Sequence, residues 1–185
     1  SGISTVTQSM FAGTSFAGTL TLRNGIISIG NNAFENFAFT GGLTIPNSVT
    51  SIGAKAFAGC AKFNDALVLS NTLASIGANA FNGSGFTGSL TIPNTVTSLG
   101  DGAFANCVAF DGNLTIGNGI SAIKANMFAN SINFAKTLDL GTGVTTIEAG
   151  TFKGFKFTGT LTIPSQLTNI QNEVFMNCTG LTTLT

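Results

Sequence analysis

The amino-acid sequence predicts a β-rich solenoid in which about eight repeats of 23 or 24 residues stack as successive coils. The first observation is a near-duplication: residues 39–60 read FTGGLTIPNSVTSIGAKAFAGC, and residues 86–107 read FTGSLTIPNTVTSLGDGAFANC. The second is a phenylalanine, called the marker Phe below, that recurs every 23 or 24 residues. The marker Phe residues are Phe11, Phe34, Phe57, Phe81, Phe104, Phe128, Phe152 and Phe175. Because such self-similarity is the signature of repeat architectures, we expect residues 1–185 to form a single solenoid domain.

The first element expected in each repeat is a short strand with a sequence such as Leu-Thr-Ile. Its aliphatic residues lie two positions apart, as Leu43 and Ile45 do, which is the period of a strand with one buried face. Pro46, Pro93 and Pro164 are expected to end this strand, because proline has no N–H to donate to a sheet. Asparagine follows in most repeats, where it suits a turn and could form a ladder of side-chain amides. These asparagines are Asn24, Asn47, Asn71, Asn94 and Asn118.

The second element is a Val-Thr-Ser-Ile segment, which we expect to be another short strand or extended piece. A glycine follows it, and a brief helical or 3₁₀ turn carrying the marker Phe is expected after the glycine. The glycine column consists of Gly30, Gly53, Gly77 and Gly100. Lys124, Glu148 and Gln171 occupy the same position in later repeats, so this position does not strictly require a positive φ.

A single repeat is too small to fold alone, because its few apolar side chains cannot offset the conformational entropy lost on ordering it. Neighbouring repeats must therefore cover each other's apolar faces and complete each other's strand hydrogen bonds. We expect residues of the same phase to lie directly on top of one another. Phe57, Phe81 and Phe104 should then form one continuous column inside the solenoid.

These columns resemble the BspA-like (Treponema pallidum-type) leucine-rich repeat. Its unit, L-x-I-P-x-x-V-x-x-I-G-x-x-A-F-x-x-C, is matched column by column by the residues from Leu43 to Cys60 and from Leu90 to Cys107. The resemblance covers essentially the whole chain and implies a leucine-rich-repeat coil. It also implies a secreted or surface-exposed protein of the kind found in bacteria and some protists, often linked to adhesion. The sequence differs from the family in its low charge and in having phenylalanine four residues before the strand.

Composition argues against several classes of function. Only 8% of the residues are charged and the net charge is zero, so no field would attract nucleic acid or an anionic membrane. Apolar residues never run far enough to span a bilayer, so we expect no membrane insertion. Histidine is absent and the seven carboxylates are scattered over different columns, which leaves no triad base and no convergent acid pair. We therefore expect no enzyme activity and no cofactor.

The three cysteines, Cys60, Cys107 and Cys178, share one column, three residues after a marker Phe. They lie two or three repeats apart, which places them beyond the reach of a disulfide bond. A metal or redox site would need further ligands nearby, and the chain has no histidine to supply them. We expect three reduced and largely buried thiols.

Two features are candidates for binding. The outward column of the Leu-Thr-Ile strand is mostly threonine: Thr21, Thr44, Thr91, Thr115 and Thr162, with Val68 and Asp139 between them. Threonine suits an exposed strand position for β-propensity and solubility alone, but the column could also form a flat surface of hydroxyl and methyl groups for a protein, a glycan or ice. The second feature is a set of three glycosylation sequons, at Asn82, Asn113 and Asn177.

Neither end of the chain shows a sequence typical of a solenoid cap, since Ile3 and Phe11 already follow the repeat and Phe175 and Leu181 still do. Two hypotheses follow: a fragment of a larger surface protein, or a subunit that associates end to end into a filament. Taken together, the sequence predicts a non-catalytic extracellular or cell-surface scaffold that binds a protein or glycan partner. The alternatives are the filament subunit and an ice- or glycan-binding threonine array.

Overall fold

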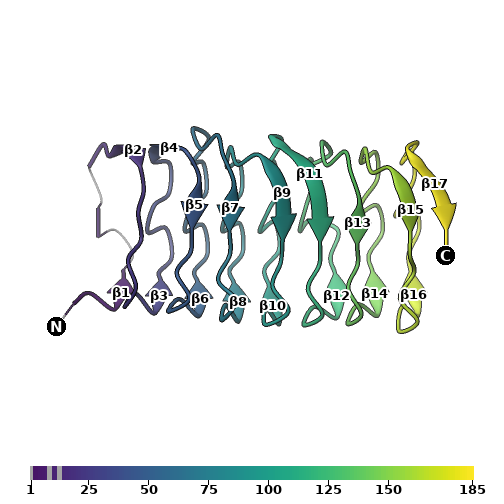
Figure 1. Ribbon diagram of the computed structural model, residues 1–185, viewed down its shortest axis with the longest axis horizontal. Helices are drawn as coiled ribbons and strands as arrows, with labels where there is room; N and C mark the ends of the chain where they lie inside the picture. Colours follow the sequence, from purple (N-terminus) through teal and green to yellow (C-terminus); the bar gives the residue numbers. More distant parts are fainter. Residues whose placement is uncertain (1, 8–9, 12–13) are drawn as a thin grey trace.

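The computed structural model describes residues 2–7, 10–11 and 14–185, and it confirms a parallel β-solenoid of about eight coils. Figure 1 shows an elongated rod in which the coils lie side by side, with the two termini at opposite ends. Every strand pair found in the described ranges is parallel, and paired residues are 21 to 24 positions apart in the sequence. The spacing of the sequence repeat is therefore the spacing of the coils.

One row of strands is formed by the Val-Thr-Ser-Ile segments, and we call it the first row. Ser51 pairs with Ser75 and Ile52 with Ile76, so equivalent residues of adjacent coils lie side by side. The row comprises the sheets β1-β3-β6-β8-β10 and β12-β14-β16. Its strands are β1 (Thr5–Val6), β3 (Ser28–Ile29), β6 (Ser51–Ile52), β8 (Ser75–Ile76), β10 (Ser98–Leu99), β12 (Ala122–Ile123), β14 (Thr146–Ile147) and β16 (Asn169–Ile170).

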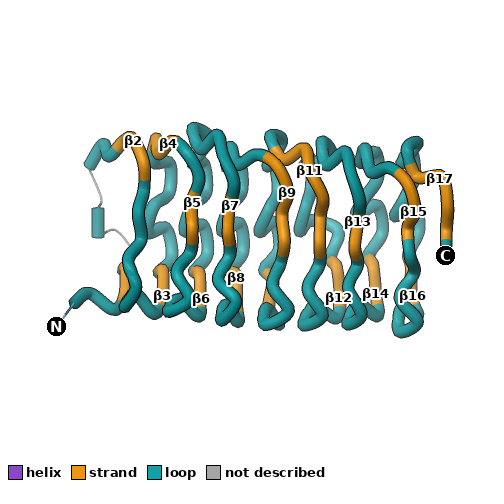
Figure 2. The backbone as a smooth tube through the Cα atoms, in the orientation of Figure 1, coloured by secondary structure: helices purple, strands orange, loops and turns teal. Residues whose placement is uncertain are grey.

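The second row is formed by the Leu-Thr-Ile segments and the residues just before them. It is divided into the sheets β2-β4, β5-β7, β9-β11-β13 and β15-β17. Figure 2 shows both rows in orange, connected by loops and turns. The strands are β2 (Ala17–Thr19), β4 (Ala38–Thr40), β5 (Leu43–Thr44), β7 (Leu67–Val68), β9 (Gly88–Thr91), β11 (Phe110–Thr115), β13 (Leu138–Asp139), β15 (Gly159–Leu161) and β17 (Leu181–Leu184).

The segments around the marker Phe residues are tight turns, whereas the sequence suggested short helical or 3₁₀ turns. The part of the chain that the structure describes contains no helix. The reason lies in residues two before and two after the marker Phe: Lys55 (φ 54°) and Gly59 (φ 71°) flank Phe57 in the left-handed region. A right-handed helix cannot continue through them. The N–H of Phe57 instead donates to Ala80 of the next coil, at 2.7 Å.

The marker Phe residues form the expected column. The ring centroids of Phe57 and Phe81 are 5.2 Å apart with their planes within 5°, and those of Phe81 and Phe104 are 5.1 Å apart with their planes within 7°. Stacked pairs continue from Phe11 to Phe175 through all eight marker residues. A second ring column runs beside it, with Phe63 and Phe86 at 4.2 Å. Both columns belong to one continuous hydrophobic core.

The glycine column after the first row needs the absence of a side chain and does not need a positive φ. Gly53, Gly77 and Gly100 lie outside the left-handed region. A Cβ added at Gly77 would lie 2.6 Å from the carbonyl carbon of Gly53 and 2.9 Å from the Cα of Ala54. Real Cβ atoms do not approach backbone this closely, so glycine allows adjacent coils to approach each other.

Replacing Gly77 by alanine is expected to lower the free energy of unfolding by about 1–3 kcal/mol, because two coils must move apart to admit the methyl group. Chemical denaturation measures this loss. Ala74→Thr is the matched control: it adds atoms in the same coil at an exposed position whose neighbours, Thr50 and Thr97, are already threonine. A Gly77→Ala variant as stable as the control would contradict the close approach.

Candidate functional site

The threonine column lies on the outward side of the second row. Thr91 pairs with Thr115, and Thr115 pairs with Asp139, so the column continues in register from coil to coil. Thr21, Thr44, Thr91 and Thr162 are exposed and Thr115 is half-buried. The adjacent leucines of the strands, such as Leu90 and Leu114, are buried. The period of the strand therefore separates an outer column of hydroxyl groups from the core.

Part of this surface is hollowed and not flat. Thr91 and Thr115 line an open groove of about 370 Å³, which we call the Thr–Asn groove. Its full lining is Asn71, Thr91, Ile92, Pro93, Asn94, Thr115, Ile116, Asn118, Asp139 and Gly141. A comparable hollow of about 380 Å³ lies over the first coils, where Thr21 and Thr44 contribute to the lining. The structure thus places four of the five predicted threonines in grooves of the same row.

The asparagines at the edge of the groove bind the backbone of the next coil. The side-chain Oδ1 of Asn94 accepts a hydrogen bond from the N–H of Asn118, and that of Asn118 accepts one from Thr142, both at 2.9 Å. Asn47 accepts in the same way from Asn71 at 3.3 Å. The expected ladder of side-chain amides is therefore a ladder of amide-to-backbone bonds. Since Oδ1 is used in the ladder, each Nδ2 group is left as a donor.

A ladder between side-chain amides does occur, in a column that sequence reasoning missed. The Nδ2 of Asn106 donates to Asn82 at 3.1 Å, and the Nδ2 of Asn130 donates to Asn106 at 2.9 Å. Asn106 and Asn130 have positive φ, and both lie two residues after a marker Phe. The recurrence of asparagine at that offset was the signal available in the sequence.

The three sequons lie in different environments. Asn82 is half-buried within the amide ladder, and the hydroxyl of Ser84 in the same sequon is buried. Asn113 is half-buried, and its Oδ1 accepts hydrogen bonds from the N–H and hydroxyl of Thr137 at 3.1 and 3.0 Å. Asn177 is exposed at a turn. All three stay predicted acceptors, and Asn177 has the most accessible side chain.

The cysteine column supplies hydrogen-bond donors to the core. The thiols of Cys60, Cys107 and Cys178 are free and buried, as expected. Each thiol donates to the carbonyl of the marker Phe one coil earlier, with sulfur–oxygen distances of 3.0 Å. Ser131 takes the same place and donates to Phe104 at 2.6 Å. Burial raises the pKa of Cys60 to about 12 and that of Cys107 to about 11, and it also raises the pKa of Cys178.

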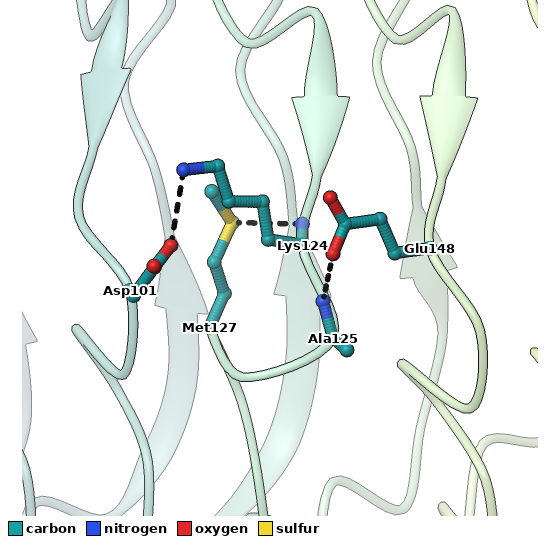
Figure 3. Close-up of polar contacts among 5 residues, drawn as sticks. All are labelled: Asp101, Lys124, Ala125, Met127 and Glu148. Carbon is teal, nitrogen blue, oxygen red and sulfur yellow. Dashed lines mark hydrogen bonds and ion pairs between the residues drawn. The ribbon is translucent and has the colours of Figure 1, made fainter.

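Charged side chains connect coils at the surface. Figure 3 shows Lys124, whose Nζ lies 3.1 Å from Oδ1 of Asp101, and Glu148, whose Oε2 accepts a hydrogen bond from the N–H of Ala125 at 3.1 Å. The Lys124 and Asp101 side chains are 48% and 60% exposed, so this ion pair contributes little to stability. Across the described ranges, no group of three or more histidine, cysteine or acidic residues could hold a metal ion.

A family model described as the BspA type leucine rich repeat region matches residues 1–111 and 74–185. The chain belongs to the BspA-type leucine-rich repeat family. No curated protein sequence matches it. Among the described residues, no helix of the length and apolarity needed to cross a membrane was found.

Solved structures of leucine-rich repeat proteins resemble this chain. A leucine rich cell surface protein from Faecalibacterium prausnitzii is 25% identical with a TM-score of 0.57, over 99% of this chain and 57% of that one. A leucine-rich repeat protein from Bacteroides ovatus is 23% identical with a TM-score of 0.58, over 88% and 53%. The leucine rich repeat protein of T. pallidum is 20% identical with a TM-score of 0.55, over 82% and 81%. The likeness to the B. ovatus and T. pallidum proteins shows the fold alone. This BspA-type chain spans little more than half the length of the F. prausnitzii and B. ovatus proteins.

Proposed function

We propose that this chain is a non-catalytic extracellular or cell-surface scaffold that binds another macromolecule through the second row of strands. The observation that carries the proposal is the Thr–Asn groove, in which hydroxyl and amide groups from successive coils line one open hollow. Such repeated surfaces are what solenoid proteins use to bind partners. The likeness to a cell surface protein from F. prausnitzii supports the location.

The composition of the groove supports binding in preference to chemistry. Asp139 is the one carboxylate among its lining residues, and its Oδ1 already accepts a hydrogen bond from the N–H of Gly141 at 2.9 Å. General acid–base catalysis requires a correctly placed acid or base with a suitable pKa, commonly assisted by a second group. Asp139 is the only base beside the hydroxyl of Thr115 among the lining residues, and no second ionisable group of the lining assists it.

The state of the cysteines is compatible with an oxidising compartment. Disulfide exchange requires an accessible thiolate, and a buried thiol with a raised pKa supplies little of it. Cys60 and Cys107 are fully buried, at 0% exposure. These two thiols can therefore remain free outside the cell without cross-linking.

Replacing both Thr91 and Thr115 by lysine is expected to abolish partner binding, because two long charged side chains would fill the groove. The fluorescently labelled chain can be tested on an array of immobilised extracellular-matrix proteins and glycans, with circular dichroism confirming the fold. The matched control is Thr97→Lys with Ser98→Lys, two exposed positions on the first row. The proposal is rejected if the groove variant binds like the native chain, or if the control loses binding equally.

A further inference from the structure

The Thr–Asn groove presents hydrogen-bonding groups whose orientation is fixed before any ligand arrives. The Oδ1 atoms of Asn94 and Asn118 are held by the N–H groups of the next coil, so their Nδ2 groups are positioned as donors. Asp139 retains one carboxylate oxygen as an acceptor after its bond to Gly141. Groups held in place in this way lose little conformational entropy when a ligand binds.

The charge of the groove restricts its ligand. Asp139 is its only charged lining residue, and neither lysine nor arginine is among them. An anionic polymer would meet a carboxylate with no cation to offset the repulsion. A strongly basic partner would gain a single ion pair, which contributes little at an exposed position. The charge of the groove therefore matches a neutral ligand.

We propose that the Thr–Asn groove binds a neutral polysaccharide lying along the axis of the rod, an inference that rests on the proposed function of the second row. Each sugar hydroxyl both donates and accepts hydrogen bonds, which complements the amide donors, the threonine hydroxyls and the free oxygen of Asp139. The paired strands place Thr91, Thr115 and Asp139 in register about every 4.8 Å, the ordinary spacing of neighbouring strands, so that each coil presents a polar oxygen. An extended peptide would instead gain from pockets for alternate side chains.

Because the lining of the groove contains no aromatic side chain, we expect weak affinity for each sugar unit. Stacking on aromatic rings adds contact area and affinity to a ligand site, and here the lining consists of threonine, asparagine, isoleucine, proline, glycine and one aspartate, with no aromatic ring. Each coil therefore contributes little, and the contributions add along a polymer that contacts several coils at once. Long chains bind, and free monosaccharides compete poorly with them.

The test is affinity electrophoresis of the native chain, labelled with a polyanionic fluorescent dye because its net charge of zero gives it almost no mobility of its own. The gels contain neutral polysaccharides (hydroxyethyl cellulose, mannan or starch), with alginate and dextran sulfate as anionic comparators. We expect retardation in at least one neutral gel and none in the anionic gels. Oligosaccharides should compete more strongly as they lengthen. The absence of retardation in every neutral gel, or equal retardation in the anionic gels, overturns the proposal.

An isosteric pair of variants locates the site. Asn118→Asp keeps the oxygen that accepts from Thr142 and replaces the Nδ2 donor by a carboxylate oxygen, so affinity should fall by about tenfold or more. Asn47→Asp makes the same change in the same column, outside the lining of the groove, and should alter affinity by no more than about twofold. Equal effects of the two variants overturn the assignment to the groove.

The array and the electrophoresis together distinguish a failure of this inference from a failure of the proposed function. If array binding is lost in the Thr91→Lys, Thr115→Lys variant but no polysaccharide retards the chain, the scaffold proposal stands and the polysaccharide proposal fails. Binding to protein spots that long neutral polysaccharides do not inhibit would identify a protein as the occupant. If the lysine variant keeps all binding, both proposals fail.

Discussion

Replacing Phe81 by alanine is expected to lower the free energy of unfolding by about 3–5 kcal/mol, the cost of removing a fully buried aromatic side chain. Phe81 is 0% exposed, and its ring stacks between those of Phe57 and Phe104. It also meets the edge of Phe86, in the second ring column, at a centroid distance of 6.2 Å. The truncation therefore interrupts one column and weakens its contact with the other.

Urea denaturation followed by circular dichroism measures this loss. Phe16→Ala removes the same atoms from a ring that is 49% exposed, and it should cost less than half as much as Phe81→Ala. Because stability in a repeat protein depends on contacts between neighbouring repeats, loss of Phe81 should also broaden the transition. Equal losses at Phe81 and Phe16 would show that the stacked column is not the main source of stability.

Raising the pH from 8 to 11 is expected to destabilise the fold through its buried thiols. An unfolded thiol ionises near its ordinary pKa of 9.0, whereas the pKa of Cys60 is raised to about 12 and that of Cys107 to about 11. Below pH 9 both states are protonated and the full stability is present. Above it only the unfolded state releases protons, so stability falls until the pH reaches the folded pKa. The slope is about 1.4 kcal/mol per pH unit for each thiol.

Cys107→Ser isolates one thiol of this effect. Serine already occupies the equivalent position at Ser131 and donates to a marker Phe carbonyl, so the variant should fold. Between pH 9 and 11, its unfolding free energy should fall less steeply than that of the native chain by about 1.4 kcal/mol per pH unit. Thiol reagents at pH 8 should react slowly with Cys60 and Cys107 in the native protein and count three thiols after denaturation. Parallel pH profiles, or rapid reaction of the native thiols, would contradict their burial.

The ring columns could be predicted from the sequence because stacked repeats place residues of one phase in contact. The turns could not be predicted as readily. Left-handed positions beside a marker Phe are easiest to see when glycine or asparagine occupies them, as at Gly59 and Asn79. Lys55 and Glu173 adopt the same conformation with residues that rarely do, so no uniform residue type marked the column. The Ala-Phe pairs then suggested a helical turn.

The period of the strand predicted that Thr91 and Thr115 point outward, but it did not predict the groove beside them. Its shape depends on how the turn after each strand packs on the next coil, and the direction of Asn94 depends on an N–H supplied by Asn118, a full repeat later. The sequence of a single repeat contains neither the packing of its turn on the next coil nor the hydrogen bond between Asn94 and Asn118. The donor role of the cysteine column was hidden for the same reason, since its acceptors lie one coil earlier.

The hydrogen bonds between coils also determine how the rod responds to mechanical load. Bonds such as that from Phe57 to Ala80 connect neighbouring coils, which follow one another along the long axis. Tension on the two ends therefore pulls these bonds apart in sequence and does not shear a whole sheet at once. Each coil that detaches releases about 80 Å of extended chain, at roughly 3.4 Å for each of its residues. A rod built in this way lengthens stepwise under tension and can rewind when the load falls.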